Sequence, residues 1–212
     1  MKSRFRRPEG QRRYKRMFVI VAEGTVTEQE YFHLFEDELL VEGSFVHVKC
    51  LPNKANLPPR EALRRVREYV HKESLKRTDE AWVVVDMDYW SEEHLVELHG
   101  WAQSRKNYGF ALSNPKFEYW LLLHFEDAKG VATGEDCDKK LAKHLPDYDK
   151  HVYGRKFTRE KIQAAIDRAK KRDIPPCADW PRKTGTTVYK LVEKILESGT
   201  RYSSSQQSYT RA

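Results

Sequence analysis

Ala81-Trp82-Val83-Val84-Val85-Asp86-Met87-Asp88 is the stretch of sequence that decides the fold. Its first five residues strongly prefer strands, and they run directly into two carboxylates that stand one residue apart. An unbroken run of this kind is typical of a strand buried on both faces, as in a parallel α/β sheet. In such sheets the ligand crevice lies beyond the carboxyl ends of the strands. Because side chains alternate along a strand, Asp86 and Asp88 point to the same side if the strand continues that far.

The pair of Asp86 and Asp88 is open to two interpretations. Two carboxylates at one strand end are suitable ligands for Mg²⁺, which usually takes one or two protein carboxylates and keeps several waters. Acidic residues also commonly end strands as solvated side chains or as caps of the next helix. The pair alone therefore does not establish a metal site.

A second apolar run, Met17-Phe18-Val19-Ile20-Val21-Ala22, ends at Glu23-Gly24 and predicts another strand. Thr27 and Glu30 follow with the spacing of a capping box. The helix that they introduce has one apolar face, made of Tyr31, Leu34, Phe35 and Leu39. The pattern is therefore strand, turn and helix, with Glu23 at the carboxyl end of its strand.

If these two strands are neighbours, one crevice holds Glu23, Asp86 and Asp88. Three carboxylates in one crevice repel one another unless a divalent cation occupies the site or protons are taken up. The sequence therefore favours a divalent-cation site, Mg²⁺ or Mn²⁺, with Asp86 and Asp88 as candidate ligands and Glu23 beside them, while proton uptake stays open as the alternative.

A fourth carboxylate is expected at the same edge of the sheet. Residues 108–112 predict a strand, and residues 116–125 predict a helix that is apolar nearly all round and hence buried on most sides. Glu118 lies in the first turn of this helix, where an acid gains from the helix dipole. It can also enter the crevice, to bind a second ion or to orient a metal-bound water. His124 lies roughly 120° around the helix from Glu118, and is better explained as a hydrogen-bonded core residue.

The remaining patterns complete an α/β fold. Residues 45–51 predict a strand near the sheet edge, and residues 60–76 and 91–102 predict helices. We therefore expect a mostly parallel central sheet of about four strands, flanked by helices.

The chain divides into four segments. Residues 17–127 are predicted to form the catalytic core, and residues 128–198 a helical extension packed on it. Residues 1–16 form a basic arm that we expect to be flexible. Residues 199–212 are rich in Ser, Gln and Thr and are expected to be a disordered tail.

The basic character of the chain comes from the arm. The formal net charge is +7, and residues 1–16 hold eight Lys and Arg against one acid, so the rest of the chain is balanced. Such an arm, with Arg12 and Arg13, could neutralise nucleic-acid phosphates without reading their sequence, or could simply be a solubilising tail. Lys54, in a proline-rich loop, and Lys116 are further candidate phosphate contacts, although a solvated lysine is the simpler interpretation of Lys54.

Other classes of protein are disfavoured. No segment approaches the roughly 18 continuous apolar residues of a membrane span, and the run before Glu23 is too short for a signal peptide. The three cysteines are widely spaced and make neither a disulfide framework nor a zinc site. We expect a cytoplasmic protein with no membrane partner.

Several blocks of the sequence resemble known families. A strand that ends in Glu23-Gly24, followed by one that ends in Asp86 and Asp88, resembles the Toprim domain of topoisomerases, DnaG-type primases and certain nucleases. Four longer blocks of the sequence resemble the RloB family. The first is Val19-Ile20-Val21-Ala22-Glu23-Gly24 with Thr27-Glu28 and Tyr31-Phe32, and the second is the strand at Asp86. The other two are Ser113-Asn114-Pro115-Lys116-Phe117-Glu118-Tyr119-Trp120-Leu121-Leu122-Leu123-His124-Phe125 and Thr187-Val188-Tyr189-Lys190-Leu191-Val192. The resemblance spans about residues 17–197.

The resemblance implies a Toprim-like fold and a metal site more firmly than it implies a substrate. It implies a nuclease encoded near bacterial restriction and phage-defence systems, with Glu23 as general base or as a further metal ligand. A topoisomerase also needs a nucleophilic tyrosine on a separate domain, and a primase needs template-binding modules. This chain has room for neither, which favours simple hydrolysis.

The leading hypothesis is therefore Mg²⁺- or Mn²⁺-dependent hydrolysis of phosphodiester bonds in RNA or DNA, with Glu23, Asp86, Asp88 and Glu118 as catalytic residues. One alternative is a non-catalytic nucleic-acid-binding partner of a defence complex. Another is a phosphotransfer enzyme that acts on nucleotides. All three hypotheses imply a phosphate-bearing partner, and the first two allow a protein partner from a defence system.

Overall fold

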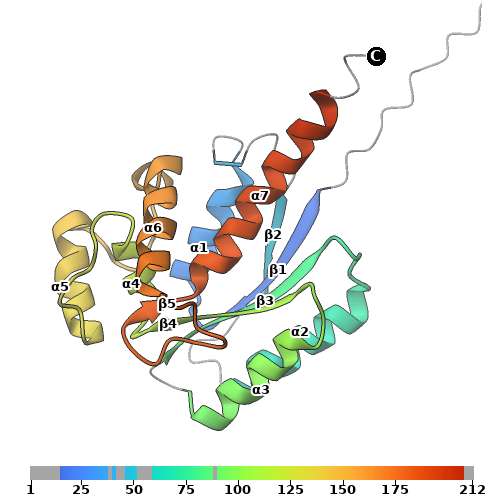
Figure 1. The fold of residues 1–212 in the computed structure, drawn as a ribbon, viewed down its shortest axis with the longest axis horizontal. Coiled ribbons are helices and arrows are strands. Elements are labelled where there is room, and N and C mark those ends of the chain that lie inside the picture. The colour runs from blue at the N-terminus through green and yellow to red at the C-terminus, as the bar shows by residue number, and fades with distance from the viewer. Residues whose placement is uncertain (1–14, 38–39, 42–45, 52–58, 88–89, 208–212) are drawn as a thin grey trace, which may run out of the picture.

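The centre of the molecule is a five-stranded sheet with the strand order β2-β1-β3-β4-β5, seen in a computed structural model of the chain (Figure 1). The structure describes residues 15–37, 40–41, 46–51, 59–87 and 90–207, with the backbone only for residues 199–207. The strands are β1 (Arg16–Ala22), β2 (Val46–Cys50), β3 (Glu80–Asp86), β4 (Tyr108–Asn114) and β5 (Gly185–Thr186). The first four are parallel, and β5 runs antiparallel to β4.

The predicted α/β fold with a mostly parallel sheet is confirmed. The strand of residues 45–51 was expected near the edge, and β2 is the edge strand. The expectation of about four strands misses β5, which pairs Thr186 with Ser113 and Gly185 with Asn114. A strand of two residues has no periodic pattern of its own, so its pairing depends on the tertiary fold.

Strands β1 and β3 are direct neighbours, as the crevice requires. Ile20 pairs with Trp82 and Ala22 with Val84. The ladder continues one residue further, because the backbone N–H of Glu23 donates to the carbonyl of Val84 at 3.1 Å. The carboxyl ends of the two strands therefore meet at the same edge of the sheet.

Helices cover both faces of the sheet. Alternate strand residues such as Val21 and Val83 pack into one buried core with α2 (Pro59–Glu73) and α3 (Glu92–Gln103). Residues such as Ile20 and Val84 point to the other face. That face is covered by α1 (Thr27–His33), α4 (Phe117–Leu122), α6 (Arg159–Arg172) and α7 (Val188–Gln207). Helix α5 (Gly134–His144) packs on α4. Two short 3₁₀ helices, η1 (Leu34–Glu36) and η3 (Gly154–Lys156), complete the described elements.

The start of α1 differs from the prediction. Its N-cap residue is Val26, and no side chain caps the helix. The predicted capping box of Thr27 and Glu30 is therefore wrong, because both side chains bond instead to a segment more than 100 residues further along the chain.

The extension is tied closely to the rest of the molecule. Its residues Ile162, Leu191 and Ile195 are fully buried in the same apolar cluster as Phe18 and Ile20 of β1. It also supplies β5 to the sheet. The boundaries that the sequence indicates stay predictions, and α7 continues to Gln207, past the point where the tail was expected to begin.

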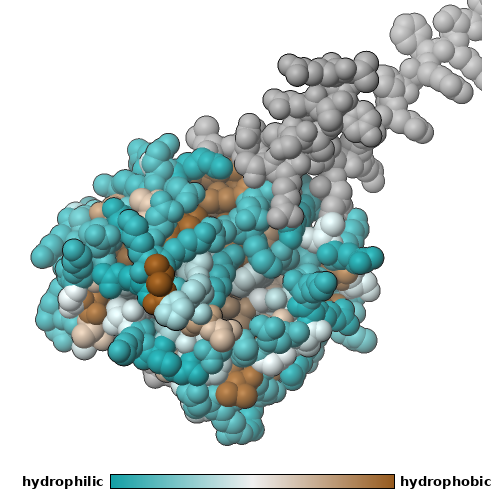
Figure 2. Space-filling model, in the orientation of Figure 1, coloured by the Kyte–Doolittle hydropathy of each residue, from teal (hydrophilic) through white to brown (hydrophobic). Residues whose placement is uncertain are grey.

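The face of the molecule shown in Figure 2 is mainly polar. On the face in Figure 2, apolar residues form small separate patches among hydrophilic ones. Among the helices that the structure describes, none combines the length and the apolar character needed to cross a bilayer.

Candidate active site

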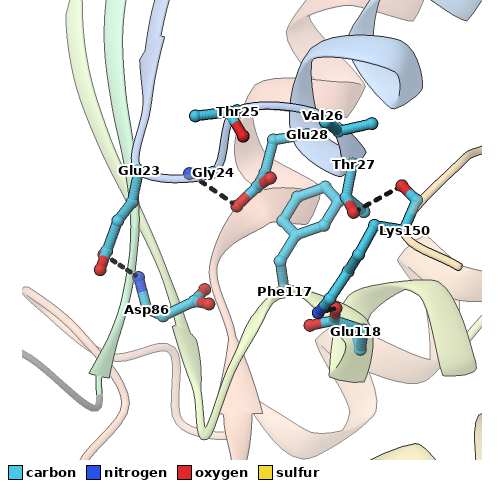
Figure 3. A pocket seen from close by; sticks show the side chains of 10 residues that line it. All are labelled: Glu23, Gly24, Thr25, Val26, Thr27, Glu28, Asp86, Phe117, Glu118 and Lys150. Atoms are coloured by element: carbon cyan, nitrogen blue, oxygen red, sulfur yellow. Dashed lines mark hydrogen bonds and ion pairs between the residues drawn. The ribbon is translucent and has the colours of Figure 1, made fainter. Parts of the chain in front are cut away.

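A pocket of about 250 Å³ opens where β1 and β3 end (Figure 3). It is lined by the turn after β1, the first turn of α1, the end of β3, the first turn of α4 and one residue of the extension. Four of the lining residues carry carboxylates and one is a lysine: Glu23, Glu28, Asp86, Glu118 and Lys150. The side chains of Glu28, Asp86 and Glu118 point toward the space between them in Figure 3.

Glu23 is fixed against the end of β3. Its Oε2 accepts hydrogen bonds from the backbone N–H of Asp86 at 3.3 Å and from Trp90 Nε1 at 2.9 Å. The ends of β1 and β3, far apart in sequence, are therefore joined here, and the Asp86 carboxylate points away from that of Glu23 toward Glu28 and Glu118 (Figure 3). Sequence reasoning had named both acids but not Trp90.

The other predicted site residues have different outcomes. Asp88, Lys54, Arg12 and Arg13 lie outside the residues that the structure describes. Lys116 is described, and its Nζ lies 2.7 Å from a carboxylate oxygen of Asp138 on α5 and 4.0 Å from Glu118. Burial lowers the pKa of Lys116, but its contacts with Asp138 and Glu118 outweigh this effect and raise it above its ordinary value.

Glu118 is 4% exposed and is held as an ion pair. Its Oε1 accepts from Lys150 Nζ at 2.5 Å and from the Tyr148 hydroxyl at 3.1 Å. Burial raises the pKa of Glu118, but Lys150 and the charge of Lys116 more than compensate, so the pKa lies below its ordinary value. Glu118 is therefore an ionised carboxylate in a nearly dry position.

Glu28 and Lys150 are the charged pocket residues that sequence reasoning missed. Glu28 is 6% exposed, and its Oε1 accepts from the backbone N–H of Gly24 at 3.2 Å. Burial, together with the negative charges of Glu118 and Glu23, raises the pKa of Glu28 from 4.5 to about 7. A signal was present in the sequence, because Glu28 precedes Tyr31 by three residues and Phe35 by seven and so shares the buried face of the helix.

Gly24 is required by this arrangement. A Cβ atom at position 24 would lie 1.9 Å from Glu28 Oε2, far inside contact distance. Any side chain at this position would therefore push the Glu28 carboxylate out of the pocket.

His124 is confirmed as a core residue outside the pocket. It is 2% exposed, and its Nδ1 donates to the backbone carbonyl of Trp120 at 3.0 Å. Its Nε2 therefore accepts from the Tyr31 hydroxyl, also at 3.0 Å. Burial lowers the pKa of His124 to about 3, so the ring is neutral.

The pocket has the right donor chemistry for a divalent cation. Glu23 and Asp86 present hard oxygen atoms at one strand edge, and Mg²⁺ usually takes only one or two carboxylates. Within the described part of the chain, however, no three His, Cys, Asp or Glu side chains are grouped closely enough to hold a metal ion. Asp88, the other predicted ligand, lies outside the described residues.

Comparison with known proteins supports one family. The family model described as RloB-like protein matches residues 18–195, which confirms the resemblance seen in the sequence. No curated protein and no solved structure gives a match.

Proposed function

The chain belongs to the RloB-like family, and from this membership together with its carboxylate-lined pocket we propose that it is a divalent-metal-dependent nuclease. It would hydrolyse phosphodiester bonds in RNA or DNA on a Toprim-like sheet. The observation that carries the proposal is the meeting of Glu23 and Asp86 at the carboxyl ends of neighbouring parallel strands, in a pocket that also holds Glu28 and Glu118. From the same family resemblance we infer a role in bacterial phage defence, with a cytoplasmic location.

Asp86 and Asp88 would hold Mg²⁺ or Mn²⁺. The bound cation would supply Lewis acidity, neutralising charge on the phosphate and lowering the pKa of a coordinated water. The hydrogen bonds from Trp90 and from the backbone of Asp86 keep the Glu23 carboxylate in one orientation. Glu23 serves as general base or as a further ligand.

Glu28 is suited to proton transfer. A catalytic acid or base works best when its pKa is near the working pH, and the pKa of Glu28 is about 7. It lines the same pocket as Asp86 and is held by the N–H of Gly24. We therefore add Glu28 to the catalytic candidates Glu23, Asp86, Asp88 and Glu118.

The test compares cleavage of labelled RNA and DNA of one sequence by the wild type, Glu23→Gln and Asp86→Asn, in Mg²⁺, in Mn²⁺ and in EDTA. Each substitution removes one charge and preserves shape, so we expect a loss of about 100-fold or more, with no cleavage in EDTA. Matched controls are Glu135→Gln and Asp167→Asn, which alter exposed acids on α5 and α6.

The outcomes separate the three hypotheses. Equal cleavage by all variants, or cleavage that does not depend on the cation, contradicts the nuclease proposal. Binding without turnover, unaffected by either carboxylate substitution, supports a non-catalytic nucleic-acid-binding protein. Activity on mononucleotides but not on polymers supports a phosphotransfer enzyme.

A further inference from the structure

Residues 148–152, between α5 and η3, form a strap that crosses the start of α1. Thr27 Oγ1 donates to the backbone carbonyl of Lys150 at 2.8 Å. The Glu30 carboxylate accepts from the backbone N–H of Val152 at 2.7 Å and lies 2.8 Å from His151 Nδ1. The two residues that had the spacing of a capping box thus anchor the strap.

A second anchor lies inside the pocket. The Tyr148 hydroxyl is 3.0 Å from Thr27 Oγ1 and donates to Glu118 Oε1 at 3.1 Å. The strap is therefore attached to α1 through Thr27 and Glu30, and to α4 through Glu118.

Lys150 has an unusual backbone within this strap. Its φ is 81°, in the left-handed region that lysine rarely adopts. Such a conformation costs a residue other than glycine about 1 kcal/mol or more, and it persists where the surroundings fix it. The bond from Thr27 to the carbonyl of Lys150 fixes it here and directs the side chain into the pocket (Figure 3).

Lys150 is the single cation among the described residues that line the pocket, against four carboxylates. Its side chain is 60% exposed, whereas that of Glu118 is 5% exposed. A lysine ammonium has three donors, and Glu118 Oε1 engages one of them. The ammonium therefore keeps two donors beyond the one that Glu118 engages.

We propose that Lys150 is a phosphate-binding residue of this site, and that Glu118 positions it there. This inference rests on the proposed function, because it names the group that offsets the repulsion between a polyanionic substrate and an acidic pocket. Lys150 Nζ donates to a non-bridging phosphate oxygen while it keeps Glu118 as its second partner. Glu118 then acts through Lys150, in contrast to the sequence-based expectation that it binds a second ion or orients a water.

The first experiment measures binding without cleavage. Labelled single-stranded DNA and RNA of about 20 nucleotides, long enough to cover a typical single-strand site, are titrated with protein in EDTA over a range of salt concentrations. Loss of one phosphate contact lowers the slope of log K against log salt by about 0.7 on a single strand. We expect this change for Lys150→Met and not for Lys143→Met, which alters an exposed lysine on α5.

The second experiment measures cleavage in Mn²⁺. Lys150→Met is expected to lower kcat/KM at least tenfold, and Lys150→Arg to restore most of it, because arginine keeps the charge. Glu118→Gln is expected to lower kcat/KM without changing the Mn²⁺ concentration required, and to have little further effect once Lys150 is methionine. A shift to higher Mn²⁺ concentration identifies Glu118 as a metal ligand and overturns its positioning role.

The free energy of unfolding of each variant is measured as well, because Lys150→Met leaves the Glu118 carboxylate without its main partner. The double variant with Glu118→Gln removes that buried charge, so its salt slope reports phosphate contact in a folded protein. If the wild type cleaves and Lys150→Met matches Lys143→Met in slope and in KM, the inference fails and the nuclease proposal stands. If no protein cleaves but the slope falls with Lys150→Met, the nuclease proposal fails and the phosphate contact stands.

Discussion

Glu28 combines burial and charge in a way that should make the stability of the protein depend on pH. Its pKa is about 7 in the folded state, against an ordinary value of 4.5. Between these two values the folded protein binds more protons than the unfolded chain, so the free energy of unfolding falls as pH rises from 4.5 to 7. Above pH 7 the ionised Glu28 carboxylate lowers the free energy of unfolding by the full amount, on the order of 3 kcal/mol.

Glu28→Gln should therefore stabilise the protein in a pH-dependent manner. Glutamine keeps an oxygen for the Gly24 N–H but carries no charge to bury. In EDTA, we expect the variant to match the wild type near pH 4 and to exceed it by about 1–3 kcal/mol at pH 8. Urea denaturation at both pH values measures the difference. Glu135→Gln, on the exposed face of α5, is the control, and an equal effect of Glu28→Gln at both pH values would contradict the assignment.

The site residues differ in how far the sequence could predict them. Glu23 and Asp86 follow unbroken apolar runs, so each falls at a strand end and the parallel sheet brings them together. Glu28 shares a helical face with Tyr31, but only the packing of that face against the rest of the molecule brings its carboxylate into the pocket. Lys150 lies in a polar segment without periodicity, and only the tertiary contact of its carbonyl with Thr27 directs it into the pocket.

At the scale of elements, the strongest strands could be predicted because burial on both faces requires an uninterrupted apolar sequence. β1 and β3 have such sequences, and their central residues are fully buried. α1 is a different case, since it has only seven residues and no capping side chain. A helix this short is stabilised by its tertiary contacts rather than by its own sequence, and the strap supplies several of them.

Thr27→Val is the substitution that tests this dependence. Valine preserves the shape of threonine but removes the hydroxyl that donates to the Lys150 carbonyl and lies 3.0 Å from the Tyr148 hydroxyl. A loss of about 1 kcal/mol corresponds to roughly fivefold more local opening. We therefore expect trypsin to cleave after Lys150 about fivefold faster under native conditions.

The matched control for the strap is Thr184→Val. Thr184 also donates from its hydroxyl to a loop carbonyl, that of Val131, at 3.1 Å. Its substitution should leave the rate of cleavage after Lys150 unchanged. Equal acceleration by both variants would mean that Thr27 does not hold the strap in particular.

At the scale of the whole molecule, the extension and the sheet share one apolar cluster and one hydrogen-bonded edge. The Leu112 N–H of β4 donates to Thr187 Oγ1 at 2.9 Å, and the Thr187 N–H donates to the Leu112 carbonyl at the same distance. A chain that ends at residue 127 would expose this edge and the apolar face that α6 and α7 cover. Tryptophan fluorescence and circular dichroism should give coincident urea transitions for the full chain and no cooperative transition for residues 1–127. A cooperative transition in the truncated chain would show that residues 17–127 fold independently.

Deletion of the basic arm tests whether the arm contributes to nucleic-acid binding. The structure shows at which residue the deletion must stop. Arg16 belongs to β1, where it pairs with the buried carboxylate of Glu80 and donates to the Thr78 carbonyl at 2.7 Å. Deleting residues 2–14 removes six of the arm's Lys and Arg residues and keeps this pair.

If the arm contacts phosphates, this deletion should lower the salt slope for single-stranded DNA by up to about 4, at about 0.7 per contact. Cleavage at low salt should persist, because every described residue of the pocket remains. Deletion of residues 2–16 is the comparison that should also reduce stability, since it leaves Glu80 without Arg16. An unchanged slope after removal of residues 2–14 would identify the arm as a solubilising tail, and loss of cleavage at low salt would favour a protein that only binds nucleic acid.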